Sequence, residues 1–310
     1  MEKKHSIPPL RGIIPPVLTP LLDRRRLDVD GFERLIEHIL AGGVNGMFFL
    51  GTTGEFCSLS QSLRMEVVKQ ATRIVAGRVP VLIGVTNTAY EELLELAFCA
   101  KEHGADAVVV APPYSMVGAE IELRNYLQSL LGDLPLPVVL YSAPPLTKAT
   151  FDLETVRWAI QQPNILGLKD SSGNLDYFKK VCGMMRERPD WSLLAGPEEL
   201  VAETVKLGGH GGISGGANLF PDLYVRLYRA ARDGDEERTR ALQLKVEQVV
   251  GRLYSFGSHP STVFKALKCA AAFMGICSEM VAPPFQQFDA STQAAVRTTL
   301  VELRELIERR

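Results

Sequence analysis

Short apolar runs alternate with amphipathic stretches along most of the chain, and turns rich in Gly, Pro, Thr or Ser separate them. The apolar runs are GIIPPVLTPL, VNGMFFLG, VPVLIGV, ADAVVVAPP, LPVVLYSAP, ILGLKD, WSLLAGP and HGGISGG. They are continuously apolar and rich in β-branched residues, whereas a half-exposed strand alternates apolar with polar positions. The pattern therefore predicts parallel strands that are buried on both faces.

Helical periodicity follows each apolar run and predicts helices over residues 30–41, 60–76, 89–103, 121–131, 153–161, 175–188, 199–207 and 221–232. Eight strand–helix units in roughly the first 230 residues predict an α/β fold of the (β/α)8 TIM-barrel type. A doubly wound open sheet is the alternative architecture.

The strand signal stops after Asp233, and the remainder of the chain has helical character, interrupted at 256–260 and 282–284. We therefore expect a barrel over residues 1–233. Residues 234–310 would form a C-terminal helical extension of the same unit.

The composition indicates a globular protein and argues against nucleic-acid-binding and membrane proteins. The 310 residues are 46% hydrophobic and 23% charged, with a net charge of −2, and no basic run interleaves with aromatic residues. These values are typical of a globular protein and argue against a nucleic-acid partner. No apolar stretch is long enough to cross a bilayer, and the first ten residues lack the apolar core of a signal peptide, so no membrane association is expected.

The cysteines and histidines indicate neither disulfides nor a metal site. The five cysteines are scattered, which predicts reduced thiols in a cytoplasmic protein. The five histidines form no HxH or HxxxH pair, and no CxxC occurs. We therefore expect no metal ion and no cofactor.

The active site of a barrel lies at the carboxyl ends of its strands. Lys169 ends the sixth apolar run and Tyr141 ends the fifth. A lysine there is either an amine nucleophile that forms an imine, or a charge paired with a carboxylate such as Asp170 or Glu55. Tyr141 is either a proton shuttle or a core residue with a tethered hydroxyl. The GTTG turn at 51–54 offers N–H groups and hydroxyls to a carboxylate.

Together these motifs resemble the dihydrodipicolinate synthase/N-acetylneuraminate lyase family of class I, Schiff-base aldolases. The resemblance runs from about residue 12 to 284. It rests on the motifs GTTGE at 51–55, PY at 113–114, LY at 140–141 with Pro144, GLKD at 167–170, LAG at 194–196 and GGIS at 211–214.

The resemblance implies roles for the residues of these motifs. Lys169 would form the imine with a 2-oxo acid, and Tyr141 would act as the acid/base. Thr52 and Thr53 would bind the carboxylate, and Thr52 would also relay protons. Tyr114 would complete that relay from a neighbouring subunit of a homotetramer built as a dimer of dimers. The pocket would be lined by the backbone of Gly196 and Ile213.

One departure from the family pattern concerns the second substrate. Dihydrodipicolinate synthases carry an arginine shortly after the strand-5 tyrosine, where it binds the carboxylate of aspartate semialdehyde, and this chain has Leu146 there. Leucine cannot form that contact, and Lys148 lies on a different phase of the turn. The resemblance to sialic-acid lyases and sugar-acid aldolases instead implies that Glu198 and Glu199 bind hydroxyls of a polyol. Alternatively, both acids merely favour a helix N-terminus.

Three other functions are compatible with the sequence. Dihydrodipicolinate synthase activity is the first alternative. The G-x-S-x-G pattern around Ser214, followed by Asp233 and His259, matches a serine hydrolase, although that fold needs further strands after the serine. A non-catalytic barrel would be expected to lack Lys169 or Tyr141. The sequence does not distinguish aldol cleavage from dehydration, nor the stereochemistry of the reaction.

Overall fold

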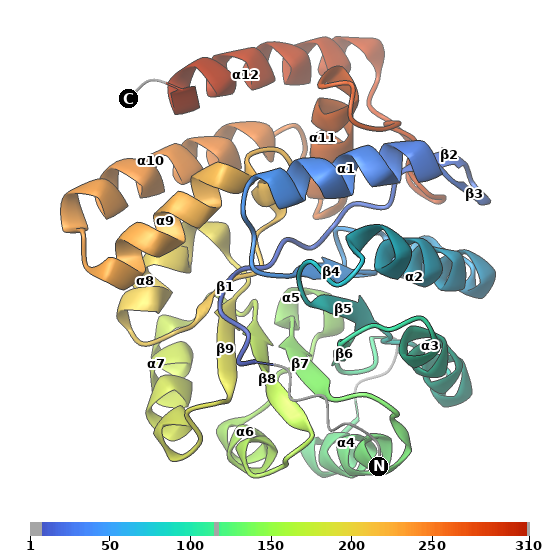
Figure 1. Cartoon of the computed structure of the whole chain (residues 1–310), viewed down its shortest axis with the longest axis vertical. Helices are drawn as coiled ribbons and strands as arrows, with labels where there is room; N and C mark the ends of the chain where they lie inside the picture. Colours follow the sequence, from blue (N-terminus) through green and yellow to red (C-terminus); the bar gives the residue numbers. More distant parts are fainter. Residues whose placement is uncertain (1–7, 115–117, 309–310) are drawn as a thin grey trace.

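Eight parallel strands form the centre of the molecule in the computed structural model, which describes residues 8–114 and 118–308 (Figure 1). Their order around the sheet is β1 (Gly12–Ile13), β10 (Gly211–Gly212), β9 (Ser192–Ala195), β8 (Ile165–Asp170), β7 (Val138–Ser142), β6 (Ala107–Val110), β5 (Val81–Gly84) and β4 (Met47–Phe49).

The sheet closes on itself between its first and last strands. The N–H of Phe48 donates to the carbonyl of Pro15 at 2.9 Å, and the N–H of Val17 donates to the carbonyl of Phe48 at 2.8 Å. These bonds join the segment after β1 to β4. The predicted barrel is confirmed, and the doubly wound open sheet is wrong.

The predicted helices are confirmed, with ends that shift by a few residues. They are α1 (Val29–Ala41), α2 (Gln61–Val75), α3 (Tyr90–Glu102), α4 (Glu120–Asp133), α6 (Leu153–Ile160), α7 (Leu175–Met184), α8 (Val201–Lys206) and α9 (Pro221–Asp233). The helix expected over 175–188 ends as a 3-10 turn at Met185–Glu187. Arg188 leaves the helical conformation there, with φ −143° and ψ 83°, as expected for the residue before Pro189.

Two short elements were not predicted from the sequence. A two-stranded antiparallel hairpin, β2 (Leu21–Asp23) and β3 (Arg26–Leu27), follows the first barrel strand. A single helical turn, α5 (Pro144–Thr147), follows β7 and carries Leu146. Both are too short for hydrophobic periodicity to identify.

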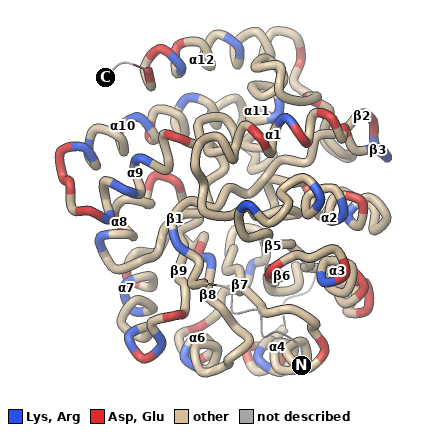
Figure 2. The backbone as a smooth tube through the Cα atoms, viewed as in Figure 1, with Lys and Arg blue, Asp and Glu red and all other residues tan. Residues whose placement is uncertain are grey.

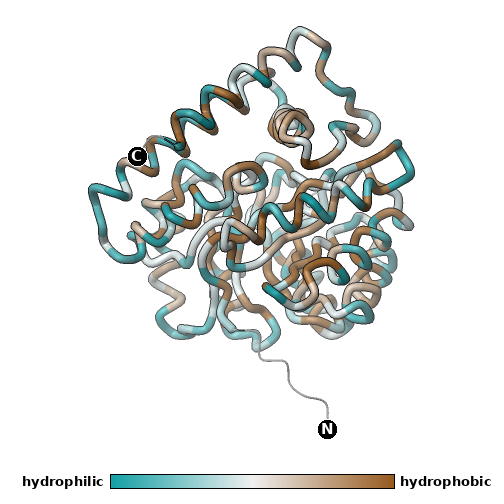
Figure 3. Tube along the Cα trace, turned by 45° about the horizontal axis from the view of Figure 1, so that its top comes forward, coloured by the Kyte–Doolittle hydropathy of each residue, from teal (hydrophilic) through white to brown (hydrophobic). Residues whose placement is uncertain are grey.

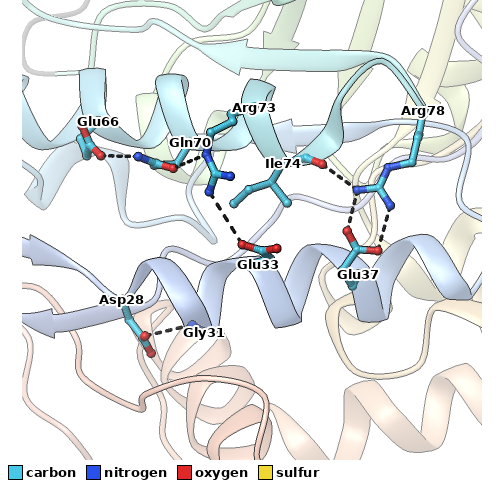
Figure 4. A network of polar contacts seen from close by, with 9 residues as sticks. All are labelled: Asp28, Gly31, Glu33, Glu37, Glu66, Gln70, Arg73, Ile74 and Arg78. Atoms are coloured by element: carbon cyan, nitrogen blue, oxygen red, sulfur yellow. Dashed lines mark hydrogen bonds and ion pairs between the residues drawn. The ribbon is translucent and has the colours of Figure 1, made fainter.

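The outer helices are held to each other by polar contacts as well as by packing (Figure 4). The side chain of Asp28 caps α1 by accepting a hydrogen bond from the N–H of Gly31 at 2.9 Å. Arg78, just after α2, forms an ion pair with Glu37 of α1 at 2.6 Å. This pair is about half exposed, so it adds little to the free energy of unfolding.

Three further helices follow the barrel: α10 (Glu236–Leu253), α11 (Ser261–Phe273) and α12 (Ala290–Glu308). Both predicted interruptions, at 256–260 and 282–284, fall between these helices. Hydrophobic and hydrophilic residues alternate along α12, and its buried residues are Val296, Leu300 and Leu303 (Figure 3). The extension is therefore helical, as expected, while its division from the barrel at residue 233 stays a prediction.

Alternation along the strands separates an interior layer from an outer layer of the core. On β7, Val139 and Tyr141 belong to the interior cluster, whereas Val138 and Leu140 pack in the outer cluster against the helices. Most charged residues lie on the helices (Figure 2). Within the described part of the chain, no helix combines the length and apolarity needed to cross a membrane.

Candidate active site

Lys169 and Tyr141 lie side by side on adjacent strands. The register of β7 and β8 pairs the two residues directly, and Lys169 Nζ lies 3.9 Å from the centroid of the Tyr141 ring. The ring of Phe48 is also close, with its centroid 5.1 Å from Nζ. Lys169 is only 4% exposed. Aromatic faces attract an ammonium group, so they hold the end of this side chain at the interior of the barrel.

Neither Asp170 nor Glu55, the two carboxylates that the alternative interpretation would pair with Lys169, forms an ion pair with it. The two oxygens of Asp170 accept hydrogen bonds from the N–H and the hydroxyl of Ser172, both at 3.0 Å. Glu55 forms an ion pair with Lys268. No ion pair within residues 8–114 and 118–308 includes Lys169. The geometry therefore favours a nucleophilic amine over a paired rim charge.

The surroundings of Tyr141 suit proton transfer. Burial acts to raise the pKa of this phenol, but the charge of Lys169 and the hydroxyls of Thr52 and Ser171 outweigh burial, so the pKa is lowered. A lowered pKa brings a phenol closer to the pH at which it can exchange a proton. Thr52 Oγ1 is buried and has no partner at full hydrogen-bonding geometry among the described residues.

The GTTG turn needs its glycines. A Cβ atom on Gly51 would lie 2.7 Å from the ring of Phe48, and one on Gly54 would lie 3.0 Å from the carbonyl of Val17. The turn is closed by a 3.0 Å hydrogen bond from the N–H of Gly54 to the carbonyl of Gly51. Thr52 therefore projects from a turn packed closely against the barrel interior.

A cavity of about 170 Å³ opens beside Tyr141. None of its lining residues is charged; they are Phe48, Leu50, Gly51, Thr52, Phe56, Cys57, Gly84, Thr86, Val109, Ala111, Tyr114, Tyr141, Ala143, Leu146 and Thr147. Leu146 lies in the wall and is 39% exposed, whereas Lys148 is exposed outside the lining. The sequence-based view of these two positions agrees with the structure.

Tyr114 lies at the rim of the cavity. The sequence-based expectation that its hydroxyl acts in the site of a neighbouring subunit stays a prediction. In the structure Tyr114 lines the cavity of its own chain, and its ring packs edge-on against Phe56 with centroids 5.8 Å apart. The segment after β6 brings Tyr114 onto the 3-10 turn at Phe56–Ser58. Residues 115–117, which follow it, lie outside the described residues.

The structure places the expected lining residues Thr53, Gly196 and Ile213 near this end of the barrel but not in the cavity wall. Thr53 is half-buried in the turn. The N–H of Gly196 donates to the carbonyl of Asp170 at 2.7 Å, and a Cβ there would meet the Ser171 hydroxyl. Ile213 is buried in the interior cluster that contains Tyr141.

The two acidic residues expected to bind a polyol have other surroundings. Glu198 is buried, and its oxygens accept hydrogen bonds from the N–H groups of Gly215 and Gly216 and from the hydroxyls of Tyr224 and Tyr254. Burial raises its pKa, against those hydrogen bonds. Glu199 is exposed outside the cavity. The polyol contact is thus not favoured, because protein donors already occupy the Glu198 carboxylate.

Sequence reasoning missed several side chains of the cavity wall. Phe56 and Cys57 follow the GTTGE motif, and Thr147 follows Leu146. Thr86 lies two residues beyond the end of β5, and its hydroxyl accepts a hydrogen bond from the N–H of Ala111 at 2.9 Å. The position of Thr86 after a strand, at the rim of the barrel, could have identified it as a wall residue. Phe56, Cys57 and Thr147 lie on short turns, where the sequence carries no such indication.

The serine hydrolase alternative finds no support. Ser214 is fully buried, and its hydroxyl has no partner among the described residues. Asp233 pairs with Arg232, and His259 is exposed. A catalytic serine needs a base within hydrogen-bonding reach. Among the described residues, no group of three or more His, Cys, Asp or Glu side chains could hold a metal ion.

Comparison with known proteins identifies the family of the chain. The chain is 37% identical to "Probable 2-dehydro-3-deoxy-D-pentonate aldolase YjhH" of Escherichia coli over 240 residues, 77% of this chain and 80% of that protein. The crystal structure of YagE, a prophage protein of E. coli in complex with pyruvate, superposes with a TM-score of 0.89 at 32% identity, covering 95% of this chain and 98% of that one.

A third relative is a dihydrodipicolinate synthase structure from Bacteroides thetaiotaomicron. It is 49% identical, with a TM-score of 0.92, and the match covers 96% of this chain and 99% of that one. The model of the Dihydrodipicolinate synthetase family matches residues 9–303. This family includes lyases of the aldolase type as well as dihydrodipicolinate synthases. The chain is therefore a lyase that belongs to the Dihydrodipicolinate synthetase family.

Proposed function

We propose that Lys169 forms a Schiff base with the C2 carbonyl of a 2-oxo acid. The observation that carries this proposal is a buried amine, without a carboxylate partner among the described residues, 3.9 Å from the ring of Tyr141. The pyruvate complex of the related YagE supports pyruvate as the acid.

The residues of the site suit each step of imine formation. The lone pair of the neutral Lys169 Nζ attacks C2, and a proton passes from the nitrogen to the carbonyl oxygen through Tyr141 to give a neutral carbinolamine. Tyr141 then donates a proton to the leaving hydroxyl, so that water departs as the C=N bond forms. Thr52 lies beside Tyr141, and its hydroxyl, which helps to lower the pKa of the phenol, is suited to pass protons to it or to hold the substrate carboxylate. Thr53 would add a second contact to that carboxylate.

Once the imine exists, it acts as an electron sink for cleavage of the substrate. The phenolate of Tyr141 accepts the proton of the C4 hydroxyl, the C3–C4 bond breaks, and its electron pair forms an enamine with C2 and the nitrogen. An aldehyde leaves, the enamine takes up a proton at C3, and water hydrolyses the imine to release the 2-oxo acid.

We propose a 2-keto-3-deoxy sugar acid as the substrate. The cavity wall carries the hydroxyls of Thr86, Tyr114 and Thr147 and no charged side chain. Hydroxyls can donate to and accept from a polyol, whereas an aldehyde with its own carboxylate needs a cation, and Leu146 cannot supply one. The names of the related YjhH and YagE proteins agree with a sugar-acid aldolase.

The second candidate is dihydrodipicolinate synthase activity, the condensation of pyruvate with aspartate semialdehyde. The synthase structure from Bacteroides thetaiotaomicron, at 49% identity, favours it. Turnover of a panel of 2-keto-3-deoxy sugar acids, sialic acid and aspartate semialdehyde, followed by pyruvate release or consumption, separates the two candidates. Efficient condensation of the semialdehyde, with a kcat/KM on the order of 10⁴ M⁻¹s⁻¹, would reject the sugar-acid proposal and leave the imine intact.

Borohydride trapping tests the imine directly. Pyruvate plus borohydride should add one reduced adduct to the peptide that contains Lys169, detected by mass spectrometry. An adduct on a different lysine, or none, would overturn the assignment.

Assembly and location complete the proposal. We expect a homotetramer built as a dimer of dimers in the cytoplasm, as is common in this family. Tyr114 lines the cavity of its own chain, and in the tetramer we expect its hydroxyl to complete the proton relay in the site of a neighbouring subunit. Sedimentation at assay concentration tests the tetramer, and a fully active monomer would contradict it.

A further inference from the structure

The turn that carries Thr52 and Thr53 continues into Glu55, whose backbone is left-handed, with a φ of 58°. A residue other than glycine seldom adopts this conformation, so surrounding contacts must hold it. The N–H of Glu55 donates to the carbonyl of Thr52 at 3.0 Å. The position of Glu55 and the shape of the turn are therefore linked.

The side chain of Glu55 points to the C-terminal part of the chain. One carboxylate oxygen forms an ion pair with Lys268 of α11, and the side chains of both residues are fully buried. The other oxygen accepts a hydrogen bond from the N–H of Ala282 at 2.7 Å. Lys268 Nζ also donates to the carbonyl of Met280 at 2.6 Å. Two charged groups and the segment after α11 thus form one buried unit.

The segment over residues 276–282, between α11 and α12, is fixed at a second place. Arg34 of α1 donates to the carbonyl of Ile276 at 2.8 Å, and Asp28 accepts from the N–H of Ser278 at 3.1 Å. Figure 1 shows α11 beside α1. Because α1 fixes one end of this segment, the other end can hold Glu55 at a defined position.

A buried ion pair is a poor source of stability, because removing both charges from water costs about as much as their attraction returns. Burial lowers the pKa of Lys268, and the Glu55 carboxylate opposes that shift. The pair does restrict its two side chains to one arrangement. We therefore expect the ion pair to contribute to the conformation of the turn that carries Thr52 more than to the free energy of unfolding.

We propose that Glu55 and Lys268 are positioning residues: they fix the orientation of the Thr52–Thr53 turn, so that the C-terminal segment sets the affinity for the 2-oxo acid carboxylate. The inference rests on the proposed function. It makes α11 and the segment at 276–282 part of the substrate-binding apparatus, although neither lines the cavity.

The test measures the pyruvate concentration that gives half-maximal borohydride trapping of Lys169. Lys268→Met should raise this concentration by about tenfold or more, while the trapped fraction at saturating pyruvate and the kcat change far less. Glu55→Gln should act in the same direction. If the single variants fail to fold, the double variant Glu55→Gln with Lys268→Met, which leaves no unpaired charge, takes their place.

Tyr254→Phe is the matched control. It removes a 2.9 Å hydrogen bond from the hydroxyl at the end of α10 to Glu198 of the barrel, and so weakens another contact between barrel and extension that does not reach the turn. Its half-maximal pyruvate concentration should match that of the unmodified protein. An unchanged midpoint in folded Glu55 and Lys268 variants, or an equal rise in Tyr254→Phe, would overturn the inference. Failure of the proposed function looks different, because the unmodified protein would then not be trapped at all.

Discussion

Two buried lysines have opposite surroundings in this molecule. Lys169, on β8, is 4% exposed and faces the rings of Tyr141 and Phe48. Lys268, on α11, is fully buried and meets the carboxylate of Glu55 and the carbonyl of Met280. The residue type and the degree of burial are almost the same, so the difference lies in the partners.

The partners decide what each amine can do. An amine that donates to a carboxylate and a carbonyl has its hydrogen-bonding capacity occupied, and it links the elements that carry those acceptors. An amine against aromatic rings keeps its lone pair available to an incoming carbonyl once it loses its proton. The comparison makes Lys169 the reactive lysine and Lys268 the structural one. Three substitutions can test it, and a fourth tests the choice of substrate at the same cavity.

The largest effect is expected for Lys169→Ala. Trapping with pyruvate and borohydride should be abolished and turnover should fall below detection, because the nucleophile is gone. Since no described carboxylate is left unpaired, the melting temperature should change little. Calorimetry beside the trapping assay checks both, and residual trapping in this variant would contradict the assignment.

Lys268→Met should have the opposite effects: a large loss of stability with little change in the trapping of Lys169 at saturating pyruvate. It leaves the Glu55 carboxylate buried and unpaired, which costs about 3–5 kcal/mol in the free energy of unfolding. Trapping of Lys169 at saturating pyruvate should persist. Urea denaturation measures the loss in the free energy of unfolding, and the additional substitution Glu55→Gln should restore part of it. If Lys268→Met alone were as stable as the unmodified protein, Lys268 would not be the structural lysine.

Tyr141→Phe sharpens the comparison at the reactive lysine, because it keeps the aromatic ring and removes the hydroxyl. The kcat should fall by roughly 10²-fold, the usual scale for a positioned acid/base. The ring should still hold Lys169, so the adduct should form, but more slowly. The rate of adduct formation is measured by stopping the trapping reaction at a series of times. An unchanged kcat would show that Tyr141 is a core residue without a role in proton transfer.

The smallest effect concerns a cation added to the cavity wall. Leu146→Arg would place a guanidinium where the unmodified wall is uncharged. A charge-assisted contact is worth roughly 1.5–3 kcal/mol, so kcat/KM for aspartate semialdehyde should rise by one to two powers of ten relative to a sugar acid. Steady-state kinetics with both substrates measures the ratio, and no change in it would show that position 146 does not select the aldehyde.

Much of the fold and part of the site could be predicted because they depend on local pattern. Continuous apolar runs followed by helical periodicity predict the barrel and its helices within a few residues. The ends of the fifth and sixth runs bring Tyr141 and Lys169 to adjacent strands, and the register pairs them. Leu146 could be assigned to the wall because it follows Tyr141 by a single short turn.

The remaining features depend on residues that are distant in sequence. The sequence determined that Glu55 and Glu198 lie next to the rim of the barrel, but only the tertiary structure showed that Lys268 neutralises one and that Tyr224 and Tyr254 bind the other. It likewise brought Tyr114 against Phe56 in the cavity wall. Periodicity reports which face of an element is buried; the partner of a buried polar group is set by how distant elements pack, because each such group must find a donor or acceptor wherever the fold brings one.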